Sequence, residues 1–230
     1  MAMKFTNHHF SSEAKRKVQG RCLTEGELLF KEMYGVKETL EEIDIAAHRL
    51  LTELLPTADL LPGADKIVKH FHAHNIPMAI ATGSDPEGYA VKTHRNKEFF
   101  ESYFSHVVMS GDPDVKHGKP APDIFLTAAS RFSEKPKSPQ NVLVFDDALL
   151  GIKGALAAEM HTVWIPSIPD MDTSVLNTSL ALKSLIEFDP TIFNLPPYPD
   201  QQMNGFSTKN GQKESIISNK LRNVSNVSSA

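Results

Sequence analysis

The sequence predicts an α/β protein built on a doubly wound parallel sheet. From about residue 61 onward, short apolar segments of strand length alternate with segments in which apolar residues recur at helical spacing. Strands are expected at residues 77–82, 106–109, 141–145 and 161–165. Such nearly continuous apolar strands belong to sheets that helices cover on both faces. In this architecture ligands bind at the carboxyl ends of the strands.

The bulk composition excludes several classes of protein. A chain of 230 residues with 40% hydrophobic and 23% charged residues is expected to be a globular protein with one catalytic unit. Its net charge of -4 gives no reason to expect nucleic acid or an anionic membrane as a partner. Cys22 is the single cysteine, so no disulfide forms within the chain. We therefore expect a cytoplasmic protein that binds a small molecule, while the oligomeric state stays open.

The first quarter of the chain predicts a small helical module. Residues 1–19 are polar, basic and aperiodic, which predicts an irregular lead-in. Thr24 and Thr39 each stand three residues before a Glu, the pattern of a helix that begins with a capping box. After Thr39 the apolar residues recur on one helical face: Ile43, Ala46, Ala47, Leu50, Leu51 and Leu54. The helical module is assigned to residues 20–60.

The α/β core is assigned to residues 61–200 and is followed by a polar tail. Leu61-Pro62-Gly63 marks the boundary with the helical module. Residues 201–230 are rich in Ser, Asn, Gln and Lys, and such a segment cannot bury enough apolar area to offset the entropy lost on ordering. We expect this tail to be disordered.

Three polar groups stand near the edge of the sheet where a ligand is expected. Thr82-Gly83-Ser84 ends the first strand, Asp146-Asp147 ends the third, and Lys119 lies in the loop before a helix that begins near residue 122. Taken singly, they can be a turn, a helix cap and a solvated lysine. Taken together, they suit phosphoryl transfer, with the hydroxyl, the N–H groups and the ammonium on phosphate oxygens and the carboxylates on Mg²⁺.

With these residues the chain resembles the haloacid dehalogenase superfamily, in the branch of pseudouridine-5'-phosphatases and plant glycerol-3-phosphatase-like proteins. The resemblance runs from about Gly20 to Pro199, and its most specific stretches are Leu55–Ala58, Lys92–Phe100 and Gly111–Phe125. It implies a Rossmann-like core, with residues 20–60 as the remnant of a helical cap that selects the substrate. It also implies Mg²⁺ as cofactor and a small phosphorylated metabolite, such as pseudouridine 5'-phosphate or a polyol phosphate, as substrate.

The resemblance also assigns roles to the polar residues. By similarity Thr82 is the second-motif hydroxyl and Lys119 the third-motif lysine, both expected to be catalytic, and Thr82, Gly83, Ser84 and Lys119 bind the phosphate. Asp146 and Asp147 resemble the fourth-motif acids, and Asp147 is the one expected to bind Mg²⁺ directly.

The chain departs from the family pattern at the first motif. Family members begin with an apolar strand that ends in Asp-x-Asp-Gly, whose first Asp attacks phosphorus and whose second acts as acid and base. In this sequence the first Asp is Asp44, in a predicted helix, so residues 1–43 contain no candidate nucleophile. Asp112-Pro113-Asp114 is interpreted as structural, and Asp170-Met171-Asp172, which follows the last strand, as a chance likeness of the missing motif.

The missing strand has consequences for both fold and function. In the family it lies between the strands that end at Thr82 and Asp146, and each unpaired buried backbone group costs about 1–3 kcal/mol of the roughly 5–15 kcal/mol that stabilise a domain. We expect those two strands to pair directly, or the protein to be poorly stable, unless the native product has a longer amino terminus. The hypotheses are a Mg²⁺-dependent phosphatase, a non-catalytic phosphate-binding pseudoenzyme, and a truncated isoform or gene model. The chain as written is expected not to complete the family's reaction.

Overall fold

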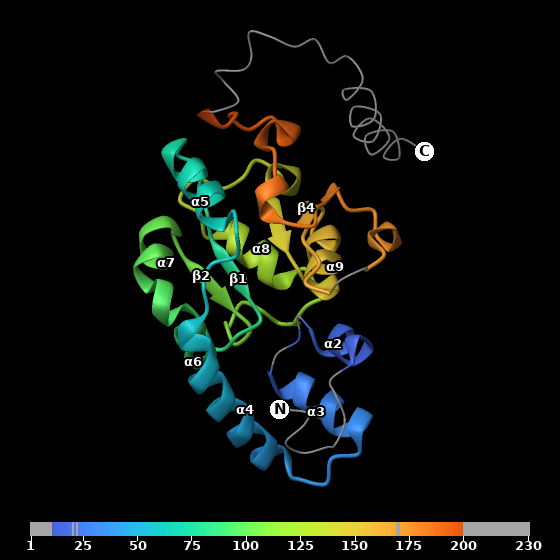
Figure 1. Ribbon diagram of the computed structural model, residues 1–230. Helices are drawn as coiled ribbons and strands as arrows, with labels where there is room; N and C mark the ends of the chain where they lie inside the picture. The colour runs from blue at the N-terminus through green and yellow to red at the C-terminus, as the bar shows by residue number, and fades with distance from the viewer. Residues whose placement is uncertain (1–10, 20, 22, 169–170, 200–230) are drawn as a thin grey trace. The chain divides into compact units, whose positions relative to one another are not determined.

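The computed structural model describes residues 11–19, 21, 23–168 and 171–199, and the chain divides into two units, residues 1–187 and 188–230. In the first unit the described strands are β1 (Ile80–Thr82), β2 (Val107–Met109), β3 (Leu143–Asp146), β4 (His161–Trp164) and β5 (Leu180–Ala181). The described α-helices are α2 (Ser12–Val18), α3 (Leu23–Tyr34), α4 (Leu40–Leu54), α5 (Ala64–Ala73), α6 (Pro86–Thr93), α7 (Lys97–Tyr103), α8 (Asp123–Ser130) and α9 (Leu149–Ala157) (Figure 1). In the second unit the described part holds a 3₁₀ helix, Pro190–Phe193, beside which the Phe188 and Phe193 rings stack with centroids 6.1 Å apart.

All described strand pairs are parallel, which confirms the predicted α/β class. β1 pairs with β2, with Thr82 opposite Met109. β3 pairs with β4, with Asp146 opposite Trp164, and β4 pairs with β5. The short β5 was not predicted, because Leu180–Ala181 is too brief to give a periodic signal.

The expectation that the strands ending at Thr82 and Asp146 pair directly is wrong. The described strands form two separate sheets, β1-β2 and β3-β4-β5. The Ile80 N–H donates a hydrogen bond to the carbonyl of His106, which stands directly before β2. Because the backbone N–H and C=O groups of successive residues in a strand point to opposite sides, those of Ala81 face away from β2. The Ala81 carbonyl accepts a hydrogen bond from Lys119 Nζ at 3.3 Å. A side chain, not the neighbouring sheet, satisfies this acceptor.

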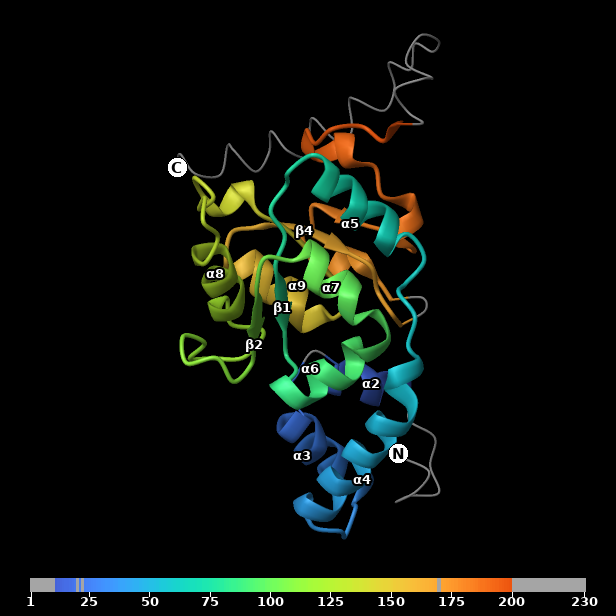
Figure 2. The ribbon, with the colours of Figure 1, turned by 90° about the vertical axis from the view of Figure 1, so that its left-hand side faces the viewer.

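Helices cover both faces of the strands. Val144 packs against a cluster that α8 and α9 share with β2 and the segment after α9. Its buried members are Val108, Ile124, Phe125, Ala128, Ala129, Ala155, Ala158 and Met160. The next residue, Phe145, points to the opposite face, where its ring lies 6.3 Å from that of Phe71 in α5. The two views in Figures 1 and 2 place α5 and α9 on opposite sides of the strands.

The N-terminal segment is more regular than predicted. α2 lies within residues 1–19, where an irregular lead-in was expected. Ser11 caps this helix by accepting the Ala14 N–H at 3.1 Å, Glu13 and Lys17 form an i,i+4 ion pair at 3.1 Å, and Ala14 is buried. These short-range signals occupy only two turns, too few for a periodic pattern. Residues 1–10 and the expected tail at 201–230 lie outside the described part.

The helical module forms its own small core. Phe30, Val36 and Ile43 pack together between α3 and α4. The capping box at Thr39 is confirmed, since Glu42 accepts the Thr39 N–H at 2.8 Å and donates its own N–H to Thr39 Oγ1 at 3.2 Å. Thr24, in contrast, lies inside a helix that begins at Leu23, so the expected cap there is wrong. Among the described helices, none combines the length and the apolar character that a membrane crossing requires.

Ile152 and Ile45 provide a matched test of where the core lies. Ile152 in α9 is fully buried, whereas Ile45 in α4 is 61% exposed. We expect Ile152→Ala to lower the free energy of unfolding by about 2–5 kcal/mol, because it removes buried apolar surface and leaves a cavity. Ile45→Ala should change it little. Urea denaturation of both variants checks this, and equal losses would contradict the described packing.

Candidate active site

A cavity of about 670 Å³ lies at the carboxyl ends of β1 and β3. Its walls include residues 81–85 at the end of β1, residues 145–148 at the end of β3, and Lys119. Arg21, Thr24 and His48 of the helical module also line it, as do Gly88 and Lys92 of α6. The structure therefore brings together the three polar groups that the sequence placed at the ligand edge of the sheet.

A buried ion pair occupies the centre of this site. Lys119 Nζ lies 2.8 Å from Asp146 Oδ2, and the two side chains are only 8% and 10% exposed. The other carboxylate oxygen of Asp146 accepts the Ala148 N–H at 2.8 Å. Lys119 Nζ also lies 5.0 Å from the centre of the Phe125 ring. The loop lysine is thereby fixed to the end of β3.

Gly151 makes the position of Asp146 possible. It lies in the first turn of α9, so close to Asp146 that a Cβ atom would overlap the carboxylate. The carboxylate cannot yield, because the Ala148 N–H and Lys119 hold its two oxygens. A glycine here is a requirement of packing.

The loop after β1 presents its hydroxyls and N–H groups to the same cavity. The Ser84 N–H donates to Thr82 Oγ1 at 3.1 Å, which folds the chain back over Gly83. Asp85 then caps α6 by accepting the Gly88 N–H at 2.6 Å. The loop is thus held in a turn that places Thr82, Gly83 and Ser84 at the wall of the cavity.

The Asp147 side chain is engaged in a hydrogen bond with another side chain. Its Oδ2 accepts a hydrogen bond of 2.7 Å from the Gln19 side chain, and that amide also donates to Ser167 Oγ at 2.6 Å. Its backbone carbonyl accepts the Trp164 indole N–H at 3.2 Å. In the described part of the chain, no group of three or more His, Cys, Asp or Glu is arranged to hold a metal ion. With Asp146 engaged by Lys119 and Asp147 by Gln19, the described carboxylates do not form a preassembled Mg²⁺ site.

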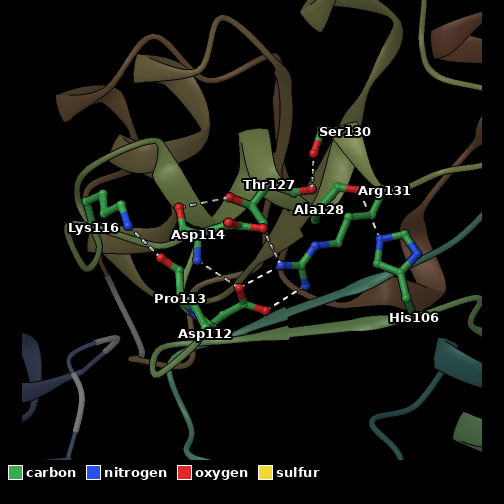
Figure 3. Close-up of polar contacts among 9 residues, drawn as sticks. All are labelled: His106, Asp112, Pro113, Asp114, Lys116, Thr127, Ala128, Ser130 and Arg131. Atoms are coloured by element: carbon green, nitrogen blue, oxygen red, sulfur yellow. Dashed lines mark hydrogen bonds and ion pairs between the residues drawn. The ribbon is translucent and has the colours of Figure 1, made fainter.

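Arg131 and two aspartates anchor the loop that leads to Lys119 (Figure 3). The guanidinium donates two bonds of 2.6 Å to the two oxygens of Asp112 and one of 2.8 Å to Asp114. The Arg131 side chain holds the pKa of Asp112 below its usual range through these bonds. This geometry supports the structural interpretation of Asp112-Pro113-Asp114.

A third carboxylate, that of Asp123, fixes the same loop nearer to the lysine. Asp123 Oδ2 accepts the backbone N–H groups of Lys116 at 3.0 Å and of His117 at 2.9 Å. These bonds lower the pKa of Asp123. The loop that leads to Lys119 is therefore held by hydrogen bonds at two places, near Asp112 and near Lys116.

Of the other sequence likeness, Asp170-Met171-Asp172, the described residues Met171 and Asp172 do not line the cavity. Asp170 lies outside the described residues. Asp172 caps a 3₁₀ helix, Thr173–Val175, by accepting the Ser174 N–H at 2.9 Å. Asp172 has the local role of a helix cap.

The helical module contributes a cluster of acids and a histidine. Glu27 of α3 is 4% exposed, and no described atom forms a hydrogen bond with its Oε1. Burial, together with the adjacent Asp44, raises the pKa of Glu27 to about 7. Burial alone would lower the pKa of His48, but Asp44, whose Oδ1 lies 3.2 Å from His48 Nδ1, and Glu87 raise it. His48 can thus present positive charge to the cavity.

Arg21, His48 and Lys92 were not identified as site residues from the sequence. Arg21 and His48 come from a separate helical module, and no local pattern shows which of its side chains face the core. The sequence did hold a signal for Lys92. It stands four residues after Gly88 and therefore on the same helical face, which points back toward Ser84 and the end of β1.

The buried ion pair predicts that two lysines contribute very differently to the stability of the protein. We expect Lys119→Ala to cost about 3–5 kcal/mol of stability, because it leaves the Asp146 carboxylate buried without its cation. Lys69→Ala is the matched control, since Lys69 and Asp65 pair on the surface of α5 with side chains 56% and 54% exposed. Denaturant unfolding measures both, and equal small losses would show that Asp146 is solvated.

Glu27 predicts a dependence of stability on pH. Between its ordinary pKa of 4.5 and about 7, the folded protein retains a proton that the unfolded chain releases. The stabilisation from this group is therefore complete below about pH 4.5 and is lost as the pH rises through about 7. In Glu27→Gln this loss should disappear, whereas the surface variant Glu32→Gln should keep it. Unfolding curves at several pH values between 5 and 8 test this, and parallel pH profiles for Glu27→Gln and the wild type would refute it.

Comparison with known proteins supports the architecture and identifies the family. Residues 8–159 match the family model described as haloacid dehalogenase-like hydrolase. The chain is 42% identical over 197 residues to (DL)-glycerol-3-phosphatase 2 of Arabidopsis thaliana, covering 84% of this chain and 81% of that protein. It is 40% identical over 197 residues to (DL)-glycerol-3-phosphatase 1, mitochondrial, of the same plant, of which it spans 65% with 84% of its own length. It is 38% identical over 154 residues to a probable pseudouridine-5'-phosphatase of Drosophila melanogaster, covering 66% of each chain.

Solved structures show the same fold. A haloacid dehalogenase hydrolase of family IA, variant 3, from Entamoeba histolytica aligns with a TM-score of 0.65 at 23% identity, covering 84% of this chain and 86% of that one. CbbY from Rhodobacter sphaeroides, in complex with phosphate, aligns with a TM-score of 0.64 at 18% identity, covering 79% and 81%. The family match and the similarity to the plant phosphatase together show that this chain belongs to the haloacid dehalogenase-like hydrolases.

Proposed function

We propose that this chain binds a small phosphomonoester at the ends of β1 and β3 and that its own hydrolytic activity is impaired. The observation that carries the proposal is the cavity in which Thr82, Ser84 and Lys119 meet. Hydroxyls, N–H groups and an ammonium are the donors that hold phosphate oxygens. A volume of about 670 Å³ suits a small metabolite.

The impairment follows from what the carboxylates of the cavity already do. Asp85 caps α6, Asp146 pairs with Lys119, and Asp147 accepts the Gln19 amide. Attack on phosphorus requires a carboxylate oxygen that is aimed at the bound phosphate and not held by another partner. Asp44, the first Asp of the sequence, lies in α4 and pairs with His48. These contacts support the proposal that none of the four acts as the nucleophile.

The relatives support a class of ligand. The proteins similar to this chain are named glycerol-3-phosphatases and a probable pseudouridine-5'-phosphatase. We propose a polyol phosphate or a pseudouridine 5'-phosphate-like compound as the ligand, hydrolysed in intact relatives through an aspartyl-phosphate. Phosphatases of this family generally use Mg²⁺, and the engagement of Asp146 and Asp147 leads us to expect weak Mg²⁺ binding here. The proposed location is the cytoplasm, on the composition of the chain, although one relative is named mitochondrial.

The alternative is an active phosphatase, and one experiment separates the two. We expect the 230-residue chain to bind inorganic phosphate saturably, with and without Mg²⁺, but not to hydrolyse glycerol 3-phosphate or pseudouridine 5'-phosphate. Equilibrium dialysis measures the binding, and release of inorganic phosphate measures turnover. Lys119→Ala provides the control for contaminating activity.

Two results would contradict the proposal. Mg²⁺-dependent turnover that disappears in Lys119→Ala would show that the chain is an active phosphatase. A protein that melts cooperatively but binds no phosphate would show that the cavity is not a phosphate site.

A further inference from the structure

Lys92 brings a second ammonium group to the cavity. It lies in the last turn of α6, and its Nζ donates a hydrogen bond to Ser84 Oγ at 2.7 Å. Both residues line the cavity. The side chain therefore points toward the N-terminus of α6, where it reaches the loop that follows β1.

The geometry of α6 explains this path. Side chains on a helix tilt toward its N-terminus, and residues four apart lie above one another on one face. The position one turn before Lys92 is Gly88, which has no side chain in the way. A Cβ atom at Gly88 would lie 3.0 Å from Asp85 Oδ1 and 3.9 Å from the Ser84 Cβ, so this face of α6 is closely approached by the loop. The spacing of Ser84, Gly88 and Lys92 thus directs the ammonium to the cavity.

The other cations of the cavity are compensated by carboxylates. Lys119 pairs with Asp146 at 2.8 Å, His48 with Asp44 at 3.2 Å and Arg21 with Glu25 at 3.5 Å. For Lys92 the contact found among the described residues is the Ser84 hydroxyl. Lys92 is exposed by its surface area, but partial desolvation lowers its pKa, and the negative charge of Asp85 opposes that shift. Lys92 therefore carries the least compensated positive charge of the cavity in the described part of the chain.

We propose that Lys92 and the Ser84 hydroxyl bind the phosphate group of the ligand, with Lys92 supplying the positive charge that Asp146 neutralises on Lys119. This inference rests on the proposed phosphate-binding function. The Ser84 hydroxyl accepts from the ammonium and can donate its proton to a phosphate oxygen, while the remaining ammonium protons reach the same anion. Lys119, held by Asp146, then orients the anion without providing net charge. Lys92 is a binding residue, and no chemical step is assigned to it.

Equilibrium dialysis of inorganic phosphate with the full chain tests this inference. We expect Lys92→Gln to weaken phosphate binding at least about tenfold, as loss of a charge-assisted hydrogen bond does. Lys92→Arg should stay within about threefold of the wild type, because the charge is kept. Lys153→Gln is the matched control, since it removes the same charge from an exposed position on α9 and should leave the affinity unchanged.

The outcomes separate this inference from the proposed function. If the wild type binds phosphate and Lys92→Gln binds it equally well, the role of Lys92 is refuted while the phosphate site remains. If the wild type binds none, the proposed function fails and this inference fails with it. Should Lys92→Gln not fold, Ser84→Ala carries the test, with weakening of about threefold or more expected. An unchanged affinity in that variant would overturn the inference.

Discussion

The ion pair between Lys119 and Asp146 is the interaction on which the rest of the site depends. It joins a loop that follows β2 to the end of β3, two segments that belong to different described sheets. Two nearly buried charges are stable only when they remain together, so the pair restrains both segments. The tight approach of Gly151 and the bond from Ala148 then fix the carboxylate from the α9 side. Because the two charges of the pair cancel, another cation of the cavity must supply the net positive charge that attracts an anion.

No described strand lies between β1 and β3, and the two described sheets stay separate instead of pairing with each other. Direct pairing would require the two strands to move to within about 5 Å of each other, along with the helices packed on each. Phe125 and Ala155 pack in one cluster across α8 and α9, and Phe71 packs against Phe145 on the other face. Close-packed interiors resist such a displacement more than they resist a polar cavity lined by side chains. Lys119, bonded to the Ala81 carbonyl, supplies part of the hydrogen bonding that a strand would supply.

The helical module adds polarity of its own to the site. Its buried acid, Glu27, and the pair of Asp44 and His48 place a proton-sensitive group in contact with the cavity lining. Arg21 reaches the same cavity from the segment before α3. The cavity is thus lined by polar groups of the core and by polar groups of the helical module. Variation of such site residues allows one fold to bind different small molecules.

The sequence alone determined the α/β class, because buried parallel strands require continuous apolar runs. Such runs are visible in the sequence at residues 143–146 and 161–164, where the structure has β3 and β4. It also determined the family and the identity of Thr82, Lys119, Asp146 and Asp147 as neighbours, since the ends of parallel strands converge. Only the tertiary structure decided which of these charges are engaged with one another, that β1 and β3 stay apart, and that Lys92 faces the cavity. Those outcomes depend on distances between segments far apart in the chain, and such distances are set by side-chain packing, which no local pattern records.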